Sequence, residues 1–418
     1  MIKSDYDVAV IGGGPAGMAA ALAAKKEGAA VLLIEREARL GGILKQCIHD
    51  GFGLVRFGEK LSGPEYAHRF IEPLLASAVD VATLHFVENI ERTKNGFFMT
   101  LVSADGVTQT SAKSIVLACG CRERTSRQVG IHGSHCVGVF TAGTAQYYTN
   151  ILGKLLTKSC VILGSGDIGL IMARRLTIEG AKVLGVYEAK PTASGLMRNV
   201  YQCLEDFDIP LYTSKTVTRV VGDERLKAVE ISDVDENMTP IAGTEETIEC
   251  DTLILSVGLI PENELAESLH TPLDNRTKGP IADQHGMSMV AGVFCCGNAL
   301  HVSDLVDYVS ESGETAGRAA AHYSPLERTF AALKTDDNVL YIVPQRLDLG
   351  DLTNPVVIYF RSREERGRSR LTVSADGKRI FSKVYPQLRP PEMERIEINF
   401  ADLDLKPQSE ISFELGDD

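Results

Sequence analysis

The sequence contains no long uninterrupted apolar run. Its longest mainly apolar stretch, Val8 to Ala24, is broken by a Gly-Gly-Gly-Pro turn and is therefore unsuited to crossing a membrane as a helix. Residues 1–7 also lack the apolar core of a secretory signal. These absences predict a protein without a transmembrane segment, located in the cytoplasm.

Positive charge is in deficit. The 418 residues include 43 Lys and Arg against 56 Asp and Glu, which gives a formal net charge of −13. Nucleic acids and anionic membranes attract basic surfaces, so this balance disfavours nonspecific binding to either of them. We therefore expect neither as a partner.

A paired cysteine framework is missing as well. The nine cysteines are odd in number and scattered along the chain, so we expect reduced and mostly buried thiols rather than disulfides. At 418 residues with 44% hydrophobic content, the chain is long enough for two or three globular domains.

The stretch from Tyr6 to Glu35 has the pattern of a dinucleotide-binding unit. A short apolar strand leads into Gly12, Gly14 and Gly17, and Pro15 suits the first turn of a following helix. Such a helix directs its N-terminal N–H groups at phosphates. A second strand then ends at Glu35, whose carboxylate is placed to accept hydrogen bonds from ribose hydroxyls.

The same pattern occurs again from Cys160 to Glu188. Its glycines are Gly164, Gly166 and Gly169, and the helix stops at Gly180, eleven residues after Gly169, just as Gly28 follows Gly17 by eleven. A single glycine motif is weak evidence of function, whereas two complete strand, turn, helix and strand units predict two nucleotide sites.

The rest of the chain adds helix and strand signals. We expect a helix at 64–79 and strands at 81–88 and 96–103. After about Glu327 the pattern changes to short strands without an evident catalytic cluster, which predicts a small all-β domain forming a sheet or a sandwich. The expected strands are Val339–Val343, Val356–Phe360, Arg370–Val373, Arg379–Val384, Arg395–Phe400 and Glu410–Leu415.

Further motifs carry a resemblance to a known superfamily. Strands end in Ala118-Cys119-Gly120, in Ser256-Val257-Gly258 and in Cys296-Gly297-Asn298. With the two nucleotide units, they resemble the pyridine nucleotide-disulfide oxidoreductases, flavoproteins with two dinucleotide domains. The resemblance covers about residues 5–325. It implies an α/β fold with two Rossmann-like domains arranged as in glutathione reductase: an FAD domain at 1–125 and 290–330, an inserted NAD(P)H domain at 126–289 and the small β domain at 331–418.

The resemblance also implies the cofactors and the residues that hold them. FAD belongs to the first unit, and NAD(H), in preference to NADP(H), to the second. Asn298 stands where the superfamily has Asp, and an amide can still hydrogen-bond the ribityl chain or a water beside the phosphates. The implied cofactor-binding residues are Gly12, Gly14, Pro15, Ala16, Gly17, Glu35, Arg36, Gly42, Ile43, Ala118, Gly120, Gly164, Gly166, Asp167, Ile168, Gly169, Glu188, Gly258, Gly297, Asn298 and Leu305.

A narrower resemblance concerns partners. Residues 41–47, 119–124 and 296–302 are similar to a branch found beside glycerol-3-phosphate dehydrogenase-like flavoproteins, with opine and cyanide-forming oxidase subunits more distant. Members of this branch commonly act as NADH-linked electron-transfer subunits, often accompanied by a small cysteine-rich protein. The resemblance thus implies a partner redox subunit, either a dehydrogenase-like flavoprotein or an iron–sulfur protein.

The cysteine positions depart from those of the disulfide reductases in this superfamily. Those enzymes carry Cys-x4-Cys after the FAD carboxylate, where this chain has Cys47 alone, and the Cys-x-x-Cys of thioredoxin reductases is missing. Cys47 and His49 are nevertheless candidate catalytic residues, because an imidazole can lower the pKa of a thiol near flavin. The alternative is that both merely line the flavin loop. Metal binding is not expected, because the possible ligands lack paired zinc-site spacing: Cys119, Cys121, His132, His135 and Cys136.

The second carboxylate decides between the nicotinamide cofactors. Glu188 should accept the 2′-hydroxyl of NADH and repel the 2′-phosphate of NADPH, an effect that Lys190 can partly offset. The leading hypothesis is an FAD-dependent oxidoreductase that exchanges hydride with NAD(H) and passes electrons to or from a partner. Two alternatives are a stand-alone NADH oxidase or peroxidase that uses Cys47, and an assembly subunit with a mainly structural flavin.

Overall fold

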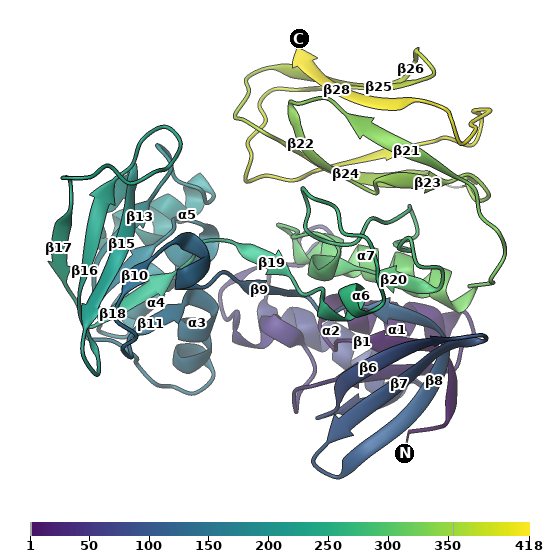
Figure 1. Ribbon diagram of the computed structural model, residues 1–418, viewed down its shortest axis with the longest axis horizontal. Coiled ribbons are helices and arrows are strands. Elements are labelled where there is room, and N and C mark those ends of the chain that lie inside the picture. The colour runs from purple at the N-terminus through teal and green to yellow at the C-terminus, as the bar shows by residue number, and fades with distance from the viewer. Residues whose placement is uncertain (1, 354) are drawn as a thin grey trace. The chain divides into compact units, whose positions relative to one another are not determined.

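The computed structural model describes residues 2–353 and 355–418, which form two compact units (Figure 1). The first unit contains the chain up to Cys121 and from Pro261 onward, and the second contains Arg122–Ile260. The second unit is therefore inserted into the first, but it ends at Ile260 rather than at the expected residue 289. The physical reason is that Ala266, Leu269 and Ala282 are buried in the core of the first unit's sheet.

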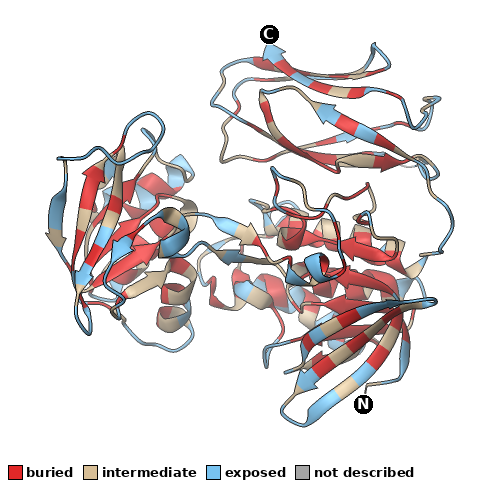
Figure 2. Cartoon of the chain, in the orientation of Figure 1, coloured by how far each residue is buried: buried red, intermediate tan, exposed pale blue. Residues whose placement is uncertain are grey.

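The first unit is organised around a sheet with the strand order β5-β2-β1-β8-β7-β6, in which β20 also pairs with β8. The strands β5, β2, β1, β8 and β20 run parallel, and β8, β7 and β6 form an antiparallel meander. Figure 2 shows buried residues along the parallel strands, and β2 is buried throughout. The strand bounds are β1 Asp5–Ile11, β2 Val31–Glu35, β5 Asp80–Thr83, β6 Phe86–Thr93, β7 Gly96–Ser103, β8 Gly106–Leu117 and β20 Val293–Cys295.

Three helices accompany this sheet: α1 (Pro15–Lys26), α2 (Gly63–Ala76) and α7 (Val306–Ala321). Helices α1 and α7 pack closely because α7 carries glycines at the contact. A Cβ at Gly313 would lie 2.2 Å from the carbonyl oxygen of Ala16, and one at Gly317 would lie 2.1 Å from that of Ala20. These contacts hold the middle of α7 against the first half of α1. The shorter elements are η1 Gly42–Gln46, β3 Asp50–Phe52, β4 Leu61–Ser62, α6 Glu264–Ser268 and η4 Gly297–Ala299.

The second unit has its own parallel sheet, of order β11-β18-β12-β13-β14, and a second sheet of order β10-β15-β16-β17. The parallel strands are β11 Val139–Thr141, β12 Ser159–Leu163, β13 Lys182–Glu188, β14 Leu211–Thr213 and β18 Thr252–Leu255. The other strands are β10 His132–Gly133, β15 Lys215–Gly222, β16 Leu226–Asp233 and β17 Glu246–Glu249. The helices are η2 Ser126–Val129, α3 Ala142–Asn150, α4 Asp167–Ile178, α5 Met197–Cys203 and η3 Glu205–Phe207, and β9 Cys121–Glu123 pairs with β19 Leu259–Pro261 where the chain enters and leaves the unit.

The C-terminal part of the first unit is the expected all-β domain, and it consists of two sheets. Their orders are β23-β21-β28-β25-β26 and β22-β24-β27, and both contribute to one apolar core. The six expected strands are present, β22 with the expected ends and the other five with shifted ends, and β21 and β23 were not anticipated. The bounds are β21 Phe330–Thr335, β22 Val339–Val343, β23 Arg346–Asp348, β24 Val356–Ser362, β25 Ser369–Ala375, β26 Lys378–Tyr385, β27 Glu394–Ile398 and β28 Ile411–Asp417.

One expected strand is wrong. The residues 81–88 form two strands, β5 and β6, because the chain turns at Leu84, which has a φ of 58°. The N–H groups of Leu84 and His85 donate to the carbonyl oxygens of Glu37 and Glu35 (both 3.1 Å). These bonds draw the turn to the end of β2. An alternating apolar pattern cannot report such a left-handed residue.

Candidate functional site: two glycine turns with buried carboxylates

The turn from β1 into α1 contains two glycines that the fold itself requires. Gly12 has a φ of +108°, and a Cβ there would lie 2.3 Å from the carbonyl oxygen of Ala118. A Cβ at Gly17 would lie 1.8 Å from the carbonyl oxygen of Gly12. A side chain at either position would therefore force α1 away from β1 and β8.

Gly14 lies between these two glycines and has no such role in the fold. Its φ of −77° is accessible to any residue, and the nearest atom to a Cβ there is the Cα of Gly42, at 3.9 Å. Gly14 is also the N-cap of α1, so the first N–H groups of the helix are close by. We call the space beside Gly14 the first cradle; it suits an anionic group such as a pyrophosphate.

The turn from β12 into α4 has the same division of roles. Gly164 has a φ of +98°, and a Cβ there would lie 2.0 Å from the carbonyl oxygen of Ser256; a Cβ at Gly169 would lie 2.4 Å from that of Gly164. Gly166 has a φ of −64°, and its Cβ would lie no closer than 3.9 Å to Ser256 Oγ. The space beside Gly166 is the second cradle.

A buried glutamate ends the next strand beside each turn. In the first unit, the N–H groups of Gly13 and Glu37 donate to Oε2 and Oε1 of Glu35, both at 2.7 Å. In the second unit, Oε2 of Glu188 accepts from the N–H (3.0 Å) and Oγ (2.6 Å) of Ser165, and Oε1 accepts from the N–H of Lys190 (3.1 Å). Both carboxylates are thus fixed in orientation before any ligand binds.

Ser165 was not among the predicted site residues. Its side chain is buried, and besides donating to Glu188 its Oγ accepts the N–H of Ser194 at 2.8 Å. The sequence did carry a signal: Ser165 occupies the place of Gly13, between the first two glycines of the motif. A hydroxyl at that position can reach the strand-end carboxylate, where glycine offers only its N–H.

Two more segments border the first cradle. The N–H of Gly41 donates to the carbonyl oxygen of Gly13 (2.9 Å), and a Cβ at Gly42 would lie 3.0 Å from the Cα of Gly14. On the other side, a Cβ at Gly297 would lie 2.8 Å from the Cβ of Ala16. The predicted residues Gly14, Ala16, Gly42 and Gly297 are therefore brought together by contacts within the chain.

Asn298 extends this border. Its Oδ1 accepts the N–H of Ser303 (3.1 Å), and its Nδ2 contacts Sγ of Cys121 (3.5 Å). The amide holds the loop that leads to Leu305, the N-cap of α7. The remaining predicted residues of this unit are Pro15 in the first turn of α1, Ala118 against Gly12 and Gly17, Gly120 with φ +78°, Arg36 exposed after β2, and Ile43 exposed in η1.

Predicted residues of the second unit are more varied in what they contact. Asp167 is the first residue of α4, but its Oδ1 accepts the N–H of Leu196 (2.9 Å) and the Nδ2 of Asn199 (2.7 Å). Its carboxylate therefore links the start of α4 to the start of α5. Ile168 packs against the apolar core of the unit, and Gly258, with φ +101°, lies near the side chain of Arg124.

A sequence model of the family described as pyridine nucleotide-disulphide oxidoreductase matches residues 6–321. The chain belongs to this family. Its members bind FAD and depend on a pyridine nucleotide, which agrees with two cradles that carry the same glycine and carboxylate geometry. The all-β domain after residue 321 lies outside the match.

Individual relatives have low sequence identity to the chain. The chain is 25% identical over 337 residues to one of the subunits of opine oxidase from Agrobacterium tumefaciens, covering 76% of this chain and 64% of the relative. It is 29% identical over 287 residues to hydrogen cyanide synthase subunit HcnB of Pseudomonas protegens, covering 62% and 58%. The chain thus spans about three fifths of these relatives. The thioredoxin reductase of T. acidophilum has the same fold over 77% of this chain and 99% of its own, with a TM-score of 0.62 and 22% identity.

Cys47, the candidate catalytic cysteine of this family member, lies in a setting that opposes thiolate chemistry. Its side chain is buried, and Sγ lies 3.4 Å from the carbonyl oxygen of Ile43. Burial raises the pKa of the Cys47 thiol to about 12. The ring of His49 packs at 5.0 Å from Phe52, and its Nδ1 lies 3.3 Å from the carbonyl oxygen of Asp50. These surroundings favour the interpretation in which both residues line the loop.

Replacing Cys47 with serine should therefore leave flavin reduction by NADH within about twofold of wild type. A thiol with its pKa near 12 has roughly 1000-fold less thiolate at neutral pH than an ordinary one, so iodoacetamide should label Cys47 far more slowly than free cysteine. Mass spectrometry of the labelled peptide measures this rate. Rapid labelling together with inactive Cys47→Ser protein would restore Cys47 as a catalytic residue.

The other thiols and acidic side chains that the structure describes form neither a disulfide nor a metal-binding group. The structure describes all nine cysteines, and none of them forms a disulfide; burial raises the pKa of Cys119 to about 12. Within the part of the chain that the structure describes, no group of three or more His, Cys, Asp or Glu side chains is placed to hold a metal ion. Across the same residues, no helix has the length and apolar character needed to cross a bilayer.

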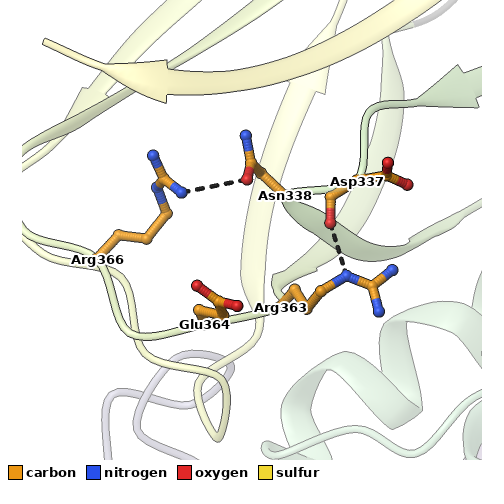
Figure 3. A pocket seen from close by; sticks show the side chains of 5 residues that line it. All are labelled: Asp337, Asn338, Arg363, Glu364 and Arg366. Carbon is orange, nitrogen blue, oxygen red and sulfur yellow. Dashed lines mark hydrogen bonds between the residues drawn. The ribbon is translucent and has the colours of Figure 1, made fainter.

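A polar pocket of about 420 Å³ lies in the β domain, apart from the two cradles. Figure 3 shows its lining, which consists of Asp337, Asn338, Arg363, Glu364 and Arg366. Nε of Arg363 donates to the carbonyl oxygen of Asp337 (2.6 Å), and Nη1 of Arg366 donates to Oδ1 of Asn338 (3.3 Å). The lining contains two arginines and two acidic residues, so its formal charges balance.

Proposed function

We propose that the protein is an FAD-dependent oxidoreductase that exchanges a hydride with NAD(H) and passes electrons to or from a partner redox subunit. The observation that carries the proposal is the pair of cradles at Gly14 and Gly166, where glycine is not needed by the fold and a buried carboxylate stands alongside. Oriented donors and acceptors of this kind position a cofactor that supplies the chemistry itself.

The residues of each cradle have separate tasks. The N–H groups at the start of α1 and α4 favour the negative charge of the two pyrophosphates. Glu35 accepts one backbone hydrogen bond on each oxygen, which leaves each oxygen able to accept another, from ribose hydroxyls. FAD held beside Gly14 and Glu35 would supply the redox chemistry, the exchange of a hydride (two electrons and one proton) with the nicotinamide, so that NADH and the oxidised acceptor would give NAD⁺, a proton and the reduced acceptor.

Three observations support a separate electron acceptor. Cys47 is buried with a raised pKa, and none of the nine cysteines forms a disulfide that could receive electrons within the chain. The relatives from Agrobacterium and Pseudomonas are both named as subunits of oxidases or synthases. Other relatives are ferredoxin–NADP reductases, such as that of Lysinibacillus sphaericus at 23% identity. We propose an iron–sulfur protein or a glycerol-3-phosphate dehydrogenase-like flavoprotein as the partner.

The proposal is tested by mixing purified, FAD-loaded protein with NADH under anaerobic conditions and following flavin absorbance. We expect rapid bleaching, slow reoxidation by oxygen, and fast NADH turnover only when an electron acceptor such as ferricyanide or ferredoxin is added. Rapid turnover with oxygen alone would instead support the stand-alone oxidase. An unbleached flavin would support the structural role, and a chain that does not bind FAD would overturn the proposal.

A further inference from the structure

Hydrogen bonds from the β domain hold the segment that connects Asn298 to α7. Nη2 of Arg361, on β24, donates to Oδ1 of Asp304 and to the carbonyl oxygen of Val302 (3.3 Å). The N–H of Met393, just before β27, donates to Oδ2 of the same aspartate (2.5 Å). Two segments of the β domain therefore hold one carboxylate in the loop that ends at Leu305.

A second set of contacts holds Glu311, in the second turn of α7. Glu311 receives the hydroxyl of Tyr359 on Oε2 (2.5 Å), together with both arms of Arg395, Nε to Oε2 (3.0 Å) and Nη2 to Oε1 (2.6 Å). Burial raises the pKa of Glu311, but the hydrogen bonds from Arg395 and Tyr359 outweigh burial and hold it below its ordinary value. Glu311 is thus an ionised group clamped by a bidentate guanidinium, the geometry of the stronger ion pairs.

Aromatic rings pack near the hydrogen bonds to Asp304 and Glu311. The ring of His301 is 5.4 Å from that of Tyr359 and 6.0 Å from that of Tyr341, and Tyr308 on α7 is 5.5 Å from Tyr359. His301 is 3% exposed. Burial and the nearby Arg361 lower the pKa of His301 to about 3, so its ring is neutral. We call Asp304, Glu311, Tyr359, Arg361 and Arg395 the clasp.

The clasped segment is the one that borders the first cradle. Gly297 packs on Ala16 in the first turn of α1, and its N–H donates to Oγ of Ser312 on α7 (2.8 Å). Oδ1 of Asn298 accepts a hydrogen bond from the N–H of Ser303, one residue before Asp304 of the clasp. A shift of α7 or of its leading loop would therefore be transmitted to the wall of the cradle through packed backbone.

We propose that the clasp positions the flavin: the β domain, without contributing a residue to the cradle, sets FAD affinity and the reduction potential of the bound flavin by fixing Gly297, Asn298 and the start of α7. This inference rests on the proposed function, in which the first cradle is the FAD site. It gives the β domain a task within the chain, separate from any contact with a partner. The five clasp residues are positioning residues and take no part in hydride transfer.

The test compares matched glutamates in the same unit. Glu311→Gln removes the charge held by Arg395 and Tyr359, whereas Glu410→Gln removes the charge of an exposed pair with Lys334 (2.9 Å) in the β domain. We expect Glu311→Gln to raise the Kd for FAD about tenfold, in keeping with the loss of charge-assisted bonds, and to shift the midpoint potential. Glu410→Gln should match wild type in both.

Tyr359→Phe keeps the packing and removes one hydroxyl, so it tests the clasp even if Glu311→Gln protein is poorly folded. We expect a weakening of FAD binding by about threefold and a shift of potential in the same direction. If both clasp variants match Glu410→Gln in FAD affinity and potential, the clasp proposal is wrong while the proposed function stands. If the wild-type protein does not bind FAD, both fall together.

Discussion

Gly14→Val should yield a folded protein that does not retain FAD. A Cβ at Gly14 meets nothing in the chain closer than 3.9 Å, and the backbone there, with φ −77° and ψ −175°, is one that valine adopts readily. The branched side chain would instead fill the first cradle and remove the close backbone approach to the pyrophosphate. We expect FAD affinity to fall roughly 100-fold or more, since several hydrogen bonds of about 1–3 kcal/mol each are lost.

Two other glycines supply the controls. Gly166→Val should leave FAD bound and abolish reduction by NADH, because the second cradle has the same spare space, 3.9 Å from Ser256 Oγ. Gly17→Val should fail to fold, because even its Cβ would lie 1.8 Å from the carbonyl oxygen of Gly12. Absorbance at the flavin bands and circular dichroism distinguish these outcomes. A yellow, fully loaded Gly14→Val protein would mean that FAD is not held at this turn.

The sequence permitted much of this architecture to be predicted because the strongest signals were local. Glycines at three fixed offsets and a strand-end carboxylate identify a nucleotide unit without knowledge of the rest of the chain. The structure shows that the three glycines of the first motif have different roles. Gly12 and Gly17 permit close packing within the first unit, and Gly14 alone leaves space for a ligand. That distinction depends on distances between segments that are remote in sequence.

What could not be predicted was long-range. The turn at Leu84 follows from hydrogen bonds to the end of β2, and the early end of the inserted unit follows from burial of Ala266 and Leu269 in a distant core. Glu311 reads in the sequence as an ordinary charge on a helix. Its importance comes from Tyr359 and Arg395, which are 48 and 84 residues away.

The clasp also changes how a partner should be sought. Deleting residues 331–418 would expose His301 and leave Glu311 without Arg395 and Tyr359, so the deletion would disturb the first cradle as well as any contact surface. Copurification with the chain that retains residues 331–418 avoids this difficulty. Recovery of an iron–sulfur protein or a second flavoprotein in that experiment would support the proposed partner.

NADH should reduce the flavin more efficiently than NADPH, and Glu188 should be responsible. Its carboxylate accepts three hydrogen bonds from Ser165 and Lys190, so about one of its four acceptor positions remains for a ribose hydroxyl. A 2′-phosphate at the same place would face a buried negative charge that the chain holds fixed. Each effect contributes about 1–3 kcal/mol, which predicts a preference on the order of 10- to 100-fold.

Two substitutions distinguish the effect of the Glu188 charge from the effect of its side-chain shape. Glu188→Gln should narrow the preference for NADH toward parity by removing the repulsion of NADPH, whereas Glu188→Ala would also leave the buried N–H of Ser165 without its acceptor. Lys190→Ala is the opposite control and should widen the preference, because its ammonium offsets part of the repulsion of NADPH. Stopped-flow reduction rates over a range of NADH and NADPH concentrations give the ratio directly, and retained FAD shows that the first unit is intact. A wild-type preference for NADPH would contradict the role of Glu188. It would mean that a cation near the 2′-phosphate, rather than this carboxylate, determines the choice between NADH and NADPH.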